Sequence, residues 1–406
     1  MPGRCNILGS VPRINRINRF NRINRFNRFN LFNRFNRFNL PSSPGDPMKK
    51  LTLLALLALA LPVHAGFYWL AVGIPAGAHG QVASGAGNYL VLANDDPSVE
   101  FDAVKLFDVR RTTTGQNRLY KNNGQNGTPP YEGCPLGGAH YDLRLPIRDE
   151  AGNEFTFVGF ASTAFQGNDF LGSIKLPDTL EYISNQAFWQ AHYLKEFVWP
   201  ADMTNLRTVG NRILDTCSRL VGPVEWPAKF PNVAQACWNC PALVGFGGFC
   251  ITNLGDCAFQ SCSSLRTVEF GGTEPVTFGN ADFQGASALK TVLFHDNPPT
   301  LNTYILGFNP STGASVGNTT FDWWSGSGAT VYVPLNATKD GPTEKWLAFK
   351  AAYEAAKEGN AVTFPTRDEE TGEWGVGTIY LKQWSKSVKL RFWDPDAQTT
   401  SALLAY

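Results

Sequence analysis

The chain has 406 residues, of which 17% are charged, and its formal net charge at pH 7 is +1. Residues 1–65 are strongly basic, with nine Arg and two Lys against one acidic residue, whereas residues 66–406 are acidic overall with dispersed lysines and arginines. This distribution argues against nucleic acid as a partner, because phosphate neutralisation needs clustered cations. No apolar run after residue 65 is long enough to span a bilayer, so no transmembrane segment is predicted there.

Residues 1–47 are of low complexity. From Arg13 to Leu40 the sequence repeats Arg-(Ile/Phe)-Asn with a period of three, which matches neither a helix nor a strand. One interpretation is a basic arm that binds nucleic acid or a membrane. The other, which we favour, is that this stretch lies upstream of the true start codon and is untranslated or unstructured.

Met48 opens a second, well-formed N-terminus. Lys49 and Lys50 precede an apolar run over residues 51–61, which Pro62 ends, and the stretch closes with Val63-His64-Ala65. This is the pattern of a secretory signal peptide, Met48–Ala65, with cleavage before Gly66. The sequence therefore predicts a secreted or cell-surface protein that starts at Met48.

Residues 66–154 are predicted to form a β-rich N-terminal cap region. Residues 89–92 and 104–109 have the composition of strands, and residues 115–138 are rich in Gly, Asn and Pro, as in a long loop. Residues 141–147 are expected to form a hairpin with residues 154–158. This hairpin would cover the open end of the segment that follows, as terminal caps do in repeat proteins.

Six copies of one pattern follow. Each copy is aligned on a leucine, and the spacings between these leucines are 23, 26, 23, 22 and 24 residues. The third copy carries one extra residue between its leucine and its last apolar position. The aligned leucines are Leu171, Leu194, Leu220, Leu243, Leu265 and Leu289.

Two further apolar columns precede each leucine. Six positions before it stand Phe165, Phe188, Leu214, Cys237, Phe259 and Phe283, called here the phenylalanine column. Five positions before that column, the residue is apolar in every copy except the fourth, which has Asn232. A period in the twenties with a strand-like L-x-x-apolar-x-apolar segment predicts a leucine-rich-repeat solenoid over residues 155–335.

Residues 336–406 are predicted to form a C-terminal helix and a small β module. A last repeat strand is expected at residues 330–334, and a helix at residues 344–358 places Trp346, Phe349 and Tyr353 on one face. Short strands are expected afterwards, and they could form a module of their own. Their predicted ranges are 361–364, 377–384 and 388–393.

The repeats resemble the BspA-type leucine-rich repeat of bacterial surface proteins. The clearest match is the copy over residues 251–271, and the pair Ala187-Phe188 fits as well. Strand-ending prolines (Pro177, Pro200 and Pro227) and the closing segment 331–334 with its aromatic helix complete the likeness, which covers about residues 155–358. The resemblance implies an exported or surface-held binding protein, often one involved in adhesion. It implies no catalytic residues.

The cysteines allow three interpretations. Cys237, Cys240, Cys257 and Cys262 have nearly the spacing of a zinc ribbon and miss it at the last gap. In the repeat register, however, Cys217, Cys240 and Cys262 share one column. A ladder of buried thiols, one or more disulfides between neighbouring coils and a metal site all remain open, and we favour the ladder. No cofactor is predicted.

No catalytic motif stands out, so a non-enzymatic protein is predicted. The histidines at positions 79, 140, 192 and 295 lie far apart in sequence. His192 and His295 fall at repeat edges and are expected to be solvated. The outward positions of the strand segments are the candidate partner-binding face, because strand side chains alternate between two sides. One row comprises Lys175, Val198, Glu225, Gly247, Glu269 and Leu293, and a second comprises Ser173, Glu196, Gly245 or Phe246, Thr267 and Thr291.

Two functions follow from the sequence. The first is binding of an extracellular protein or glycan through this strand face, in adhesion or in interaction with a host or matrix. The alternative is a secreted carbohydrate-binding or hydrolytic protein whose activity lies in the non-repeat ends, where Trp374, Tyr380, Trp384 and Trp393 could stack on sugars. The oligomeric state is not predicted.

Overall fold

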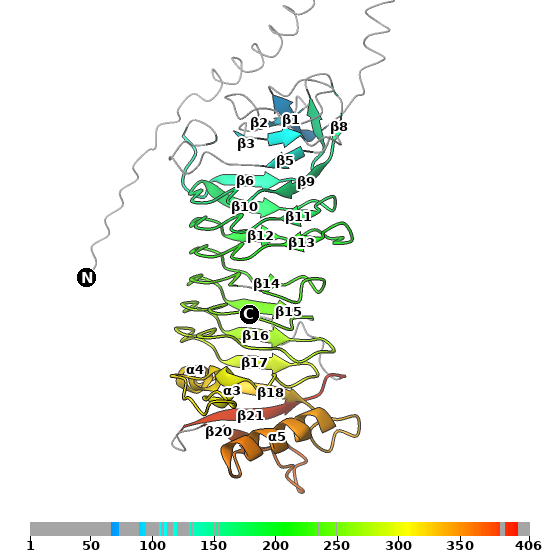
Figure 1. The fold of residues 1–406 in the computed structure, drawn as a ribbon. Coiled ribbons are helices and arrows are strands. Elements are labelled where there is room, and N and C mark those ends of the chain that lie inside the picture. Colours follow the sequence, from blue (N-terminus) through cyan, green and yellow to red (C-terminus); the bar gives the residue numbers. More distant parts are fainter. Residues whose placement is uncertain are drawn as a thin grey trace, which may run out of the picture. The chain divides into compact units, whose positions relative to one another are not determined.

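The computed structural model covers the whole chain and describes part of it (Figure 1). The described residues all belong to one unit, Ala65–Tyr406. The Arg-(Ile/Phe)-Asn tract and the predicted signal peptide lie outside them. The described ranges are 66–72, 89–94, 105–106, 109–111, 117–119, 130, 133–149, 152, 154–233, 235–248, 250–381 and 386–396.

The segments that follow the aligned leucines form strands that pair in parallel from one copy to the next (Figure 1). The first group is β6 (Ala139–Asp142), β10 (Leu171–Lys175) and β12 (Glu196–Val198). The second group is β14 (Val224–Glu225), β15 (Gly245–Gly248), β16 (Thr267–Phe270), β17 (Thr291–Phe294) and β18 (Thr330–Pro334). Each copy thus supplies one rung of a parallel ladder, which is a leucine-rich-repeat type of fold.

A second line of parallel pairing runs through the start of each copy. It joins β9 (Phe157–Phe160), β11 (Tyr182–Ile183) and β13 (Thr208–Val209) and continues as single bridges from Asn232 to Asn253 and from Asn253 to Thr277. These bridges correct the alignment of the fourth copy. Its position in the apolar column belongs to Val233, which is fully buried, and not to the exposed Asn232.

The core runs through the middle of the copies. All six members of the phenylalanine column are buried, including Leu214 and Cys237. The rings contact one another from copy to copy, as in the stacked pair Phe165–Phe188, whose centroids are 5.4 Å apart. Trp199 and Trp226 lie in this chain of rings, 5.6 Å apart, which confirms that they point inward. The aligned leucines are buried as well.

The strand ladder is interrupted once, between β12 and β14. The third copy carries its extra residue here, with Gly222 at a positive φ of 73° and Pro223 after it. Proline has no N–H to donate, and an added residue disrupts the pairing register, so β14 contains only two residues. The ring contact between Trp199 and Trp226 spans the interruption, so the core is continuous where the ladder is not.

The tight turn of each copy lies between the two lines of pairing. Non-glycine residues with positive φ recur there, for example Gln186, Gln190, Arg212 and Thr216. Backbone bonds continue through the turns from the second to the fourth copy, since Gln190 N–H donates to Asp215 O and Thr216 N–H donates to Trp238 O. The turns therefore connect the copies across the interruption in the strand ladder.

The N-terminal region is β-rich, as predicted, but the hairpin differs. Strand β7 (Ile147–Asp149) pairs antiparallel with β8 (Glu154–Phe155), whereas β6 joins the repeat ladder beside β10. The segment expected to be one long hairpin strand is thus divided between two sheets.

Further strands complete the N-terminal region. The loop expected over residues 115–138 contains β5, which pairs with β9 and β4. The strand expected over residues 104–109 is represented by parts of β3 and β4, between which residues 107–108 are not described. The remaining strands are β1 (Phe67–Val72), β2 (Tyr89–Asn94), β3 (Lys105–Leu106), β4 (Val109–Arg111) and β5 (Asn117–Leu119).

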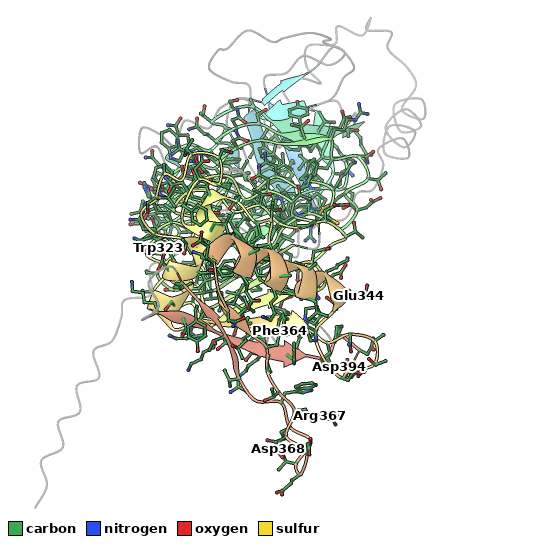
Figure 2. All side chains as sticks on the ribbon, turned by 60° about the horizontal axis from the view of Figure 1, so that its bottom comes forward. Trp323, Glu344, Phe364, Arg367, Asp368 and Asp394 are labelled. Carbon is green, nitrogen blue, oxygen red and sulfur yellow. The ribbon has the colours of Figure 1, made fainter. Side chains whose placement is uncertain are left out.

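At the other end, β21 (Ser387–Trp393) pairs in parallel with β18 and antiparallel with β20 (Gly377–Tyr380), which pairs with β19 (Val362–Thr363). These strands therefore extend the repeat sheet and do not form a sheet of their own. Helix α5 (Glu344–Lys357) buries Trp346, Phe349 and Tyr353, as predicted. It begins after the N-cap residue Thr343. Figure 2 shows α5 and, apart from it, the loop that carries Arg367 and Asp368.

Two short helices precede β18 and escaped the sequence analysis. Helix α3 (Thr303–Leu306) is capped by Asn302, and α4 (Thr320–Ser327) by a reciprocal capping box between Thr319 and Asp322. The Thr-x-x-Asp pattern is typical of a capping box, and it could have predicted the start of α4. Within the described ranges, no helix combines the length and apolarity needed to cross a membrane.

Candidate binding surfaces

The outward positions of the strands lie side by side as predicted. The register pairs Lys175 with Val198, and it aligns Glu225, Gly247, Glu269 and Leu293 in one row. The second row pairs Ser173 with Glu196 and aligns Gly245 with Thr267 and Thr291; Phe246 points inward and is fully buried. The interruption between β12 and β14 divides both rows into two parts.

Accessibility does not follow this division of the rows, and it corrects the predicted site. Glu196 and Glu225 are exposed, and Lys175 and Val198 are partly exposed. In contrast, Glu269 is 3% exposed, Thr267 4% and Leu293 0%, while Thr291 is partly exposed. Alternation along a strand determines which side a residue faces, but it does not determine whether that side is covered. The accessible strand face therefore lies in the first three copies, where Ser173 is the one buried member of the two rows.

Glu269 is part of a buried polar pair. Its Oε2 atom lies 3.3 Å from His295 Nε2, and the His295 ring contacts the Trp393 ring edge-on at 5.0 Å. The Trp393 indole N–H donates to Phe294 O at 2.9 Å. His295 was expected to be solvated at a repeat edge, and the packing of Trp393 from β21 overturns this expectation. His192 fits it, since its side chain is 42% exposed and lies 3.0 Å from Asp169.

The open part of the strand face carries charges of both signs. The Arg144 guanidinium donates to both carboxylate oxygens of Asp142, at 2.8 and 2.6 Å, and this bond lowers the pKa of Asp142 against the effect of its partial burial. His140 Nδ1 lies 2.8 Å from Ser173 Oγ on the next strand. His140, Asp142 and Arg144 lie on β6 or in the segment after it, and they extend the face of Lys175 and Glu196. They were not predicted as part of this face, because residues 141–147 were assigned to a hairpin.

A second cluster lies on the turns. The Arg212 guanidinium carbon is 5.3 Å from the ring centroid of Trp189 and 4.9 Å from that of Trp238. Arg212 also forms an ion pair of 2.5 Å with Asp215, whose side chain is 1% exposed. The three residues that surround Arg212 come from the second, third and fourth copies. The sequence feature that could have revealed this cluster is the repeat alignment, because tryptophan twice replaces glutamine at the position directly after the phenylalanine column.

The cysteines form a ladder of buried thiols, as favoured from the sequence. None of the seven cysteines in the described residues forms a disulfide. In successive copies, Cys217 Sγ donates to Phe188 O, Cys240 Sγ to Leu214 O, and Cys262 Sγ to Cys237 O, at 3.3, 3.1 and 3.0 Å. Burial raises the thiol pKa of all three, to about 12 for Cys262. These groups remain protonated and are buried hydrogen-bond donors, so they lack the thiolate that nucleophilic chemistry needs.

The aromatic residues proposed for sugar binding at the C-terminal end are distributed differently from the prediction. Trp393 is buried, while Trp374 is partly exposed and packs edge-on against Phe392 at 4.9 Å. Tyr380 is partly exposed, and Trp384 lies outside the described residues. The four residues therefore do not share one platform.

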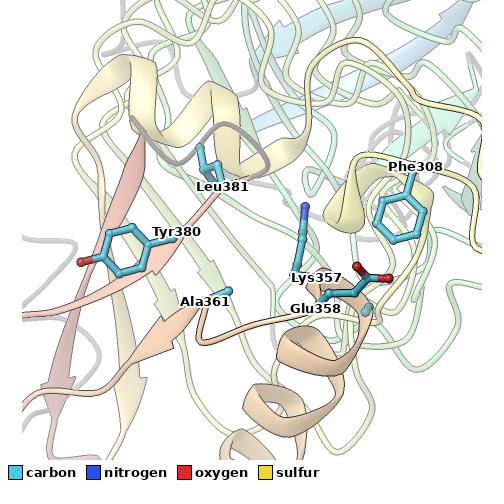
Figure 3. Close-up of a pocket in the computed structure, with 7 residues that line it drawn as sticks. Phe308, Lys357, Glu358, Ala361, Tyr380 and Leu381 are labelled. Atoms are coloured by element: carbon cyan, nitrogen blue, oxygen red, sulfur yellow. The ribbon is translucent and has the colours of Figure 1, made fainter.

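A small cavity of about 230 Å³ adjoins the C-terminal end of α5 (Figure 3). Lys357 lies between Phe308 and Leu381 in this view, and its ammonium group donates to Leu306 O. It is also 5.8 Å from the Phe308 ring centroid. This lysine links α5 to α3, so its own charge is already engaged within the protein.

Comparison with known proteins identifies the class as leucine-rich repeats. Residues 158–246 and 246–311 match the family described as BspA type Leucine rich repeat region, in six copies. The repeats of this chain are therefore of the BspA type, and the resemblance drawn from the sequence columns is confirmed. A search of curated proteins gave no match.

Several solved structures are similar to this chain. The leucine-rich-repeat protein TpLRR of T. pallidum is 21% identical, covers 45% of this chain and 88% of its own, and has a TM-score of 0.31. A leucine-rich-repeat protein of Bacteroides capillosus is 14% identical, with coverages of 48% and 96% and a TM-score of 0.22. A leucine rich cell surface protein of Faecalibacterium prausnitzii is 11% identical, with coverages of 59% and 89% and a TM-score of 0.25.

Proposed function

We propose that this chain is an exported, non-enzymatic binding protein that holds an extracellular protein through the open part of its strand face, in adhesion or in contact with a host or matrix. The accessibility of that face carries the proposal. Lys175, Glu196, Val198 and Glu225 vary in charge and polarity and reach solvent, while the inward columns of the same strands are apolar and are buried in the core or packed against it. Leucine-rich repeats present extended surfaces of this kind, which suit macromolecules better than small substrates.

The signal-peptide pattern of residues 48–65 supports export, and the BspA type of the repeats agrees with a secreted or surface-held protein. The architecture proposed with this function is a solenoid of six coils, closed by the β-rich N-terminal region and by α5 with its adjoining strands. Mass mapping of the native N-terminus tests export. A chain that starts at Gly66 outside the cell is expected, and a cytosolic chain with the Arg-(Ile/Phe)-Asn tract would contradict it.

Charge reversal tests the face itself. The triple variant Lys175→Glu, Glu196→Lys, Glu225→Lys is expected to weaken binding to immobilised matrix proteins at least tenfold without changing the thermal midpoint, because all three residues lie at the surface. The matched control is Lys229→Glu, Glu274→Lys, Glu369→Lys, which alters exposed charges away from the strand rows. Equal loss in both variants would show that general charge, and not the strand face, governs binding.

A further inference from the structure

The turns present a second surface that the strand-face proposal does not use. We define the turn face as the residue after each member of the phenylalanine column, together with the positive-φ positions on either side of it. Backbone bonds hold the copies in register here, as from Gly167 N–H to Trp189 O at 2.9 Å and from Asn239 N–H to Gln260 O at 2.8 Å. The positions directly after the phenylalanine column are Gln166, Trp189, Asp215, Trp238, Gln260 and Gln284.

The six copies serve as an internal comparison for these positions. Gln166, Gln260 and Gln284 show that an amide satisfies the packing there, whereas the second and fourth copies carry Trp189 and Trp238. Both tryptophans are partly exposed, so the core does not account for them. Large aromatic side chains that are partly exposed and not required for packing are typical of recognition surfaces.

The tryptophans are held in place by Arg212. Its guanidinium group lies between the two rings, at 5.3 and 4.9 Å from their centroids, and Asp215 fixes it from below by an ion pair of 2.5 Å. A side chain that is fixed before binding loses little conformational entropy on binding. Because Asp215 neutralises Arg212, the cluster carries no net charge.

The rest of the turn face is rich in amides that have no partner within the protein. Gln260 donates to Gln284 at 2.5 Å, but the described structure gives no side-chain hydrogen bond to five others. Amides are donors and acceptors at once and can each bind two hydroxyl groups. The five unbonded amides are Gln166, Gln186, Gln190, Gln235 and Asn239.

We propose that the turn face binds a neutral glycan that lies along the stack of repeats. The indoles of Trp189 and Trp238 contact the C–H faces of sugar rings, and the flanking amides bind the hydroxyl groups. Neighbouring copies are spaced at about 4.8 Å by their hydrogen bonding, so two indoles two copies apart are separated by about 10 Å and contact alternate rings of one extended oligosaccharide. The neutral charge of the cluster favours an uncharged glycan over an anionic one, because no clustered cations are present on the described turn face.

Binding of neutral hexasaccharides to the mature chain tests the proposal. The probes are cellohexaose, laminarihexaose, maltohexaose and xylohexaose, with heparin as the anionic comparison, measured by isothermal titration calorimetry and by indole fluorescence. At least one neutral probe is expected to bind, and Trp189→Ala and Trp238→Ala are each expected to weaken it about tenfold or more. Trp374→Ala, which removes a partly exposed tryptophan elsewhere, is the matched control and should leave the affinity unchanged.

The variant Gln166→Ala guards against loss of folding, since this side chain is partly exposed and its residue is not at a positive φ. It is expected to weaken binding while the thermal midpoint stays at the wild-type value. The proposal is overturned if no neutral probe binds, if the turn-face variants bind as the wild type does, or if heparin binds more tightly than every neutral probe. It is also overturned if these variants lose only a protein ligand. The charge-reversed strand-face variant should retain glycan binding, so the two proposals can fail separately.

Discussion

Replacing Arg212 by methionine should destabilise the protein strongly, although Arg212 lies at a turn and its side chain is 29% exposed. The substitution removes the cation between Trp189 and Trp238 and leaves Asp215 buried with Thr216 as its remaining side-chain donor. Burial raises the pKa of Asp215, while its bonds to Thr216 and Arg212 act in the opposite direction. Without Arg212, the carboxyl group must either stay charged and poorly solvated or take up a proton.

The expected loss has two parts. Removing one partner of a buried ion pair costs about 3–5 kcal/mol, and we take the lower half of that range because Arg212 is partly solvated. Two cation–π contacts at a partly exposed site add about 1–2 kcal/mol. The free energy of unfolding should therefore fall by about 4–6 kcal/mol. The position of Arg212 contributes to this loss of stability, because Arg212 joins three copies where the strand ladder is interrupted.

Urea denaturation followed by circular dichroism measures this loss, with Arg219→Met as the matched control. Arg219 is exposed, and its guanidinium lies 4.2 Å from the Tyr193 ring centroid, so its removal should cost at most about 1 kcal/mol. The double variant Arg212→Met, Asp215→Asn should recover most of the ion-pair part. The reasoning is refuted if Arg212→Met costs no more than Arg219→Met, or if the double variant is as unstable as the two single losses added together.

Three further results are expected. Burial raises the pKa of Asp282 to about 7 from an ordinary 3.8, so its contribution to stability is complete below pH 4 and is lost as the pH rises through 7. The free energy of unfolding of Asp282→Asn minus that of the wild type, measured by urea denaturation, should therefore rise over that window by at most about 4 kcal/mol. A difference that does not change with pH would contradict this. In the native protein, a thiol reagent should modify the exposed Cys250 readily, whereas the buried cysteines should react only after unfolding. The buried cysteines are Cys217, Cys237, Cys240 and Cys262. Rapid modification of these four in the native protein would contradict the buried ladder. Phe188→Ala should lower the free energy of unfolding by about 3–5 kcal/mol, because the Phe188 ring contacts Phe160, Phe165 and Phe197. Leu347→Ala, at an exposed position, should lower it by less than about 1 kcal/mol. Similar losses in the two variants would show that the aromatic column is not the core.

The sequence alone determined the repeats and their inward columns. Spacing and alternation depend only on local chain geometry, so the aligned leucines, the phenylalanine column, β18 and α5 could be placed within a residue or two. The buried thiol column followed for the same reason, because copies in register bring equivalent positions together. Even the pairing of Lys175 with Val198 was accessible from the sequence.

Only the tertiary structure decided which outward residues reach solvent. Glu269 and Leu293 occupy the same row as the accessible Glu225, but the repeat period carries no information about what lies over the row. The packing of Trp393 against His295 likewise joins two segments whose separation in sequence follows no repeat period. Local pattern fixes the direction of a side chain, whereas its exposure and its partners depend on packing between distant segments.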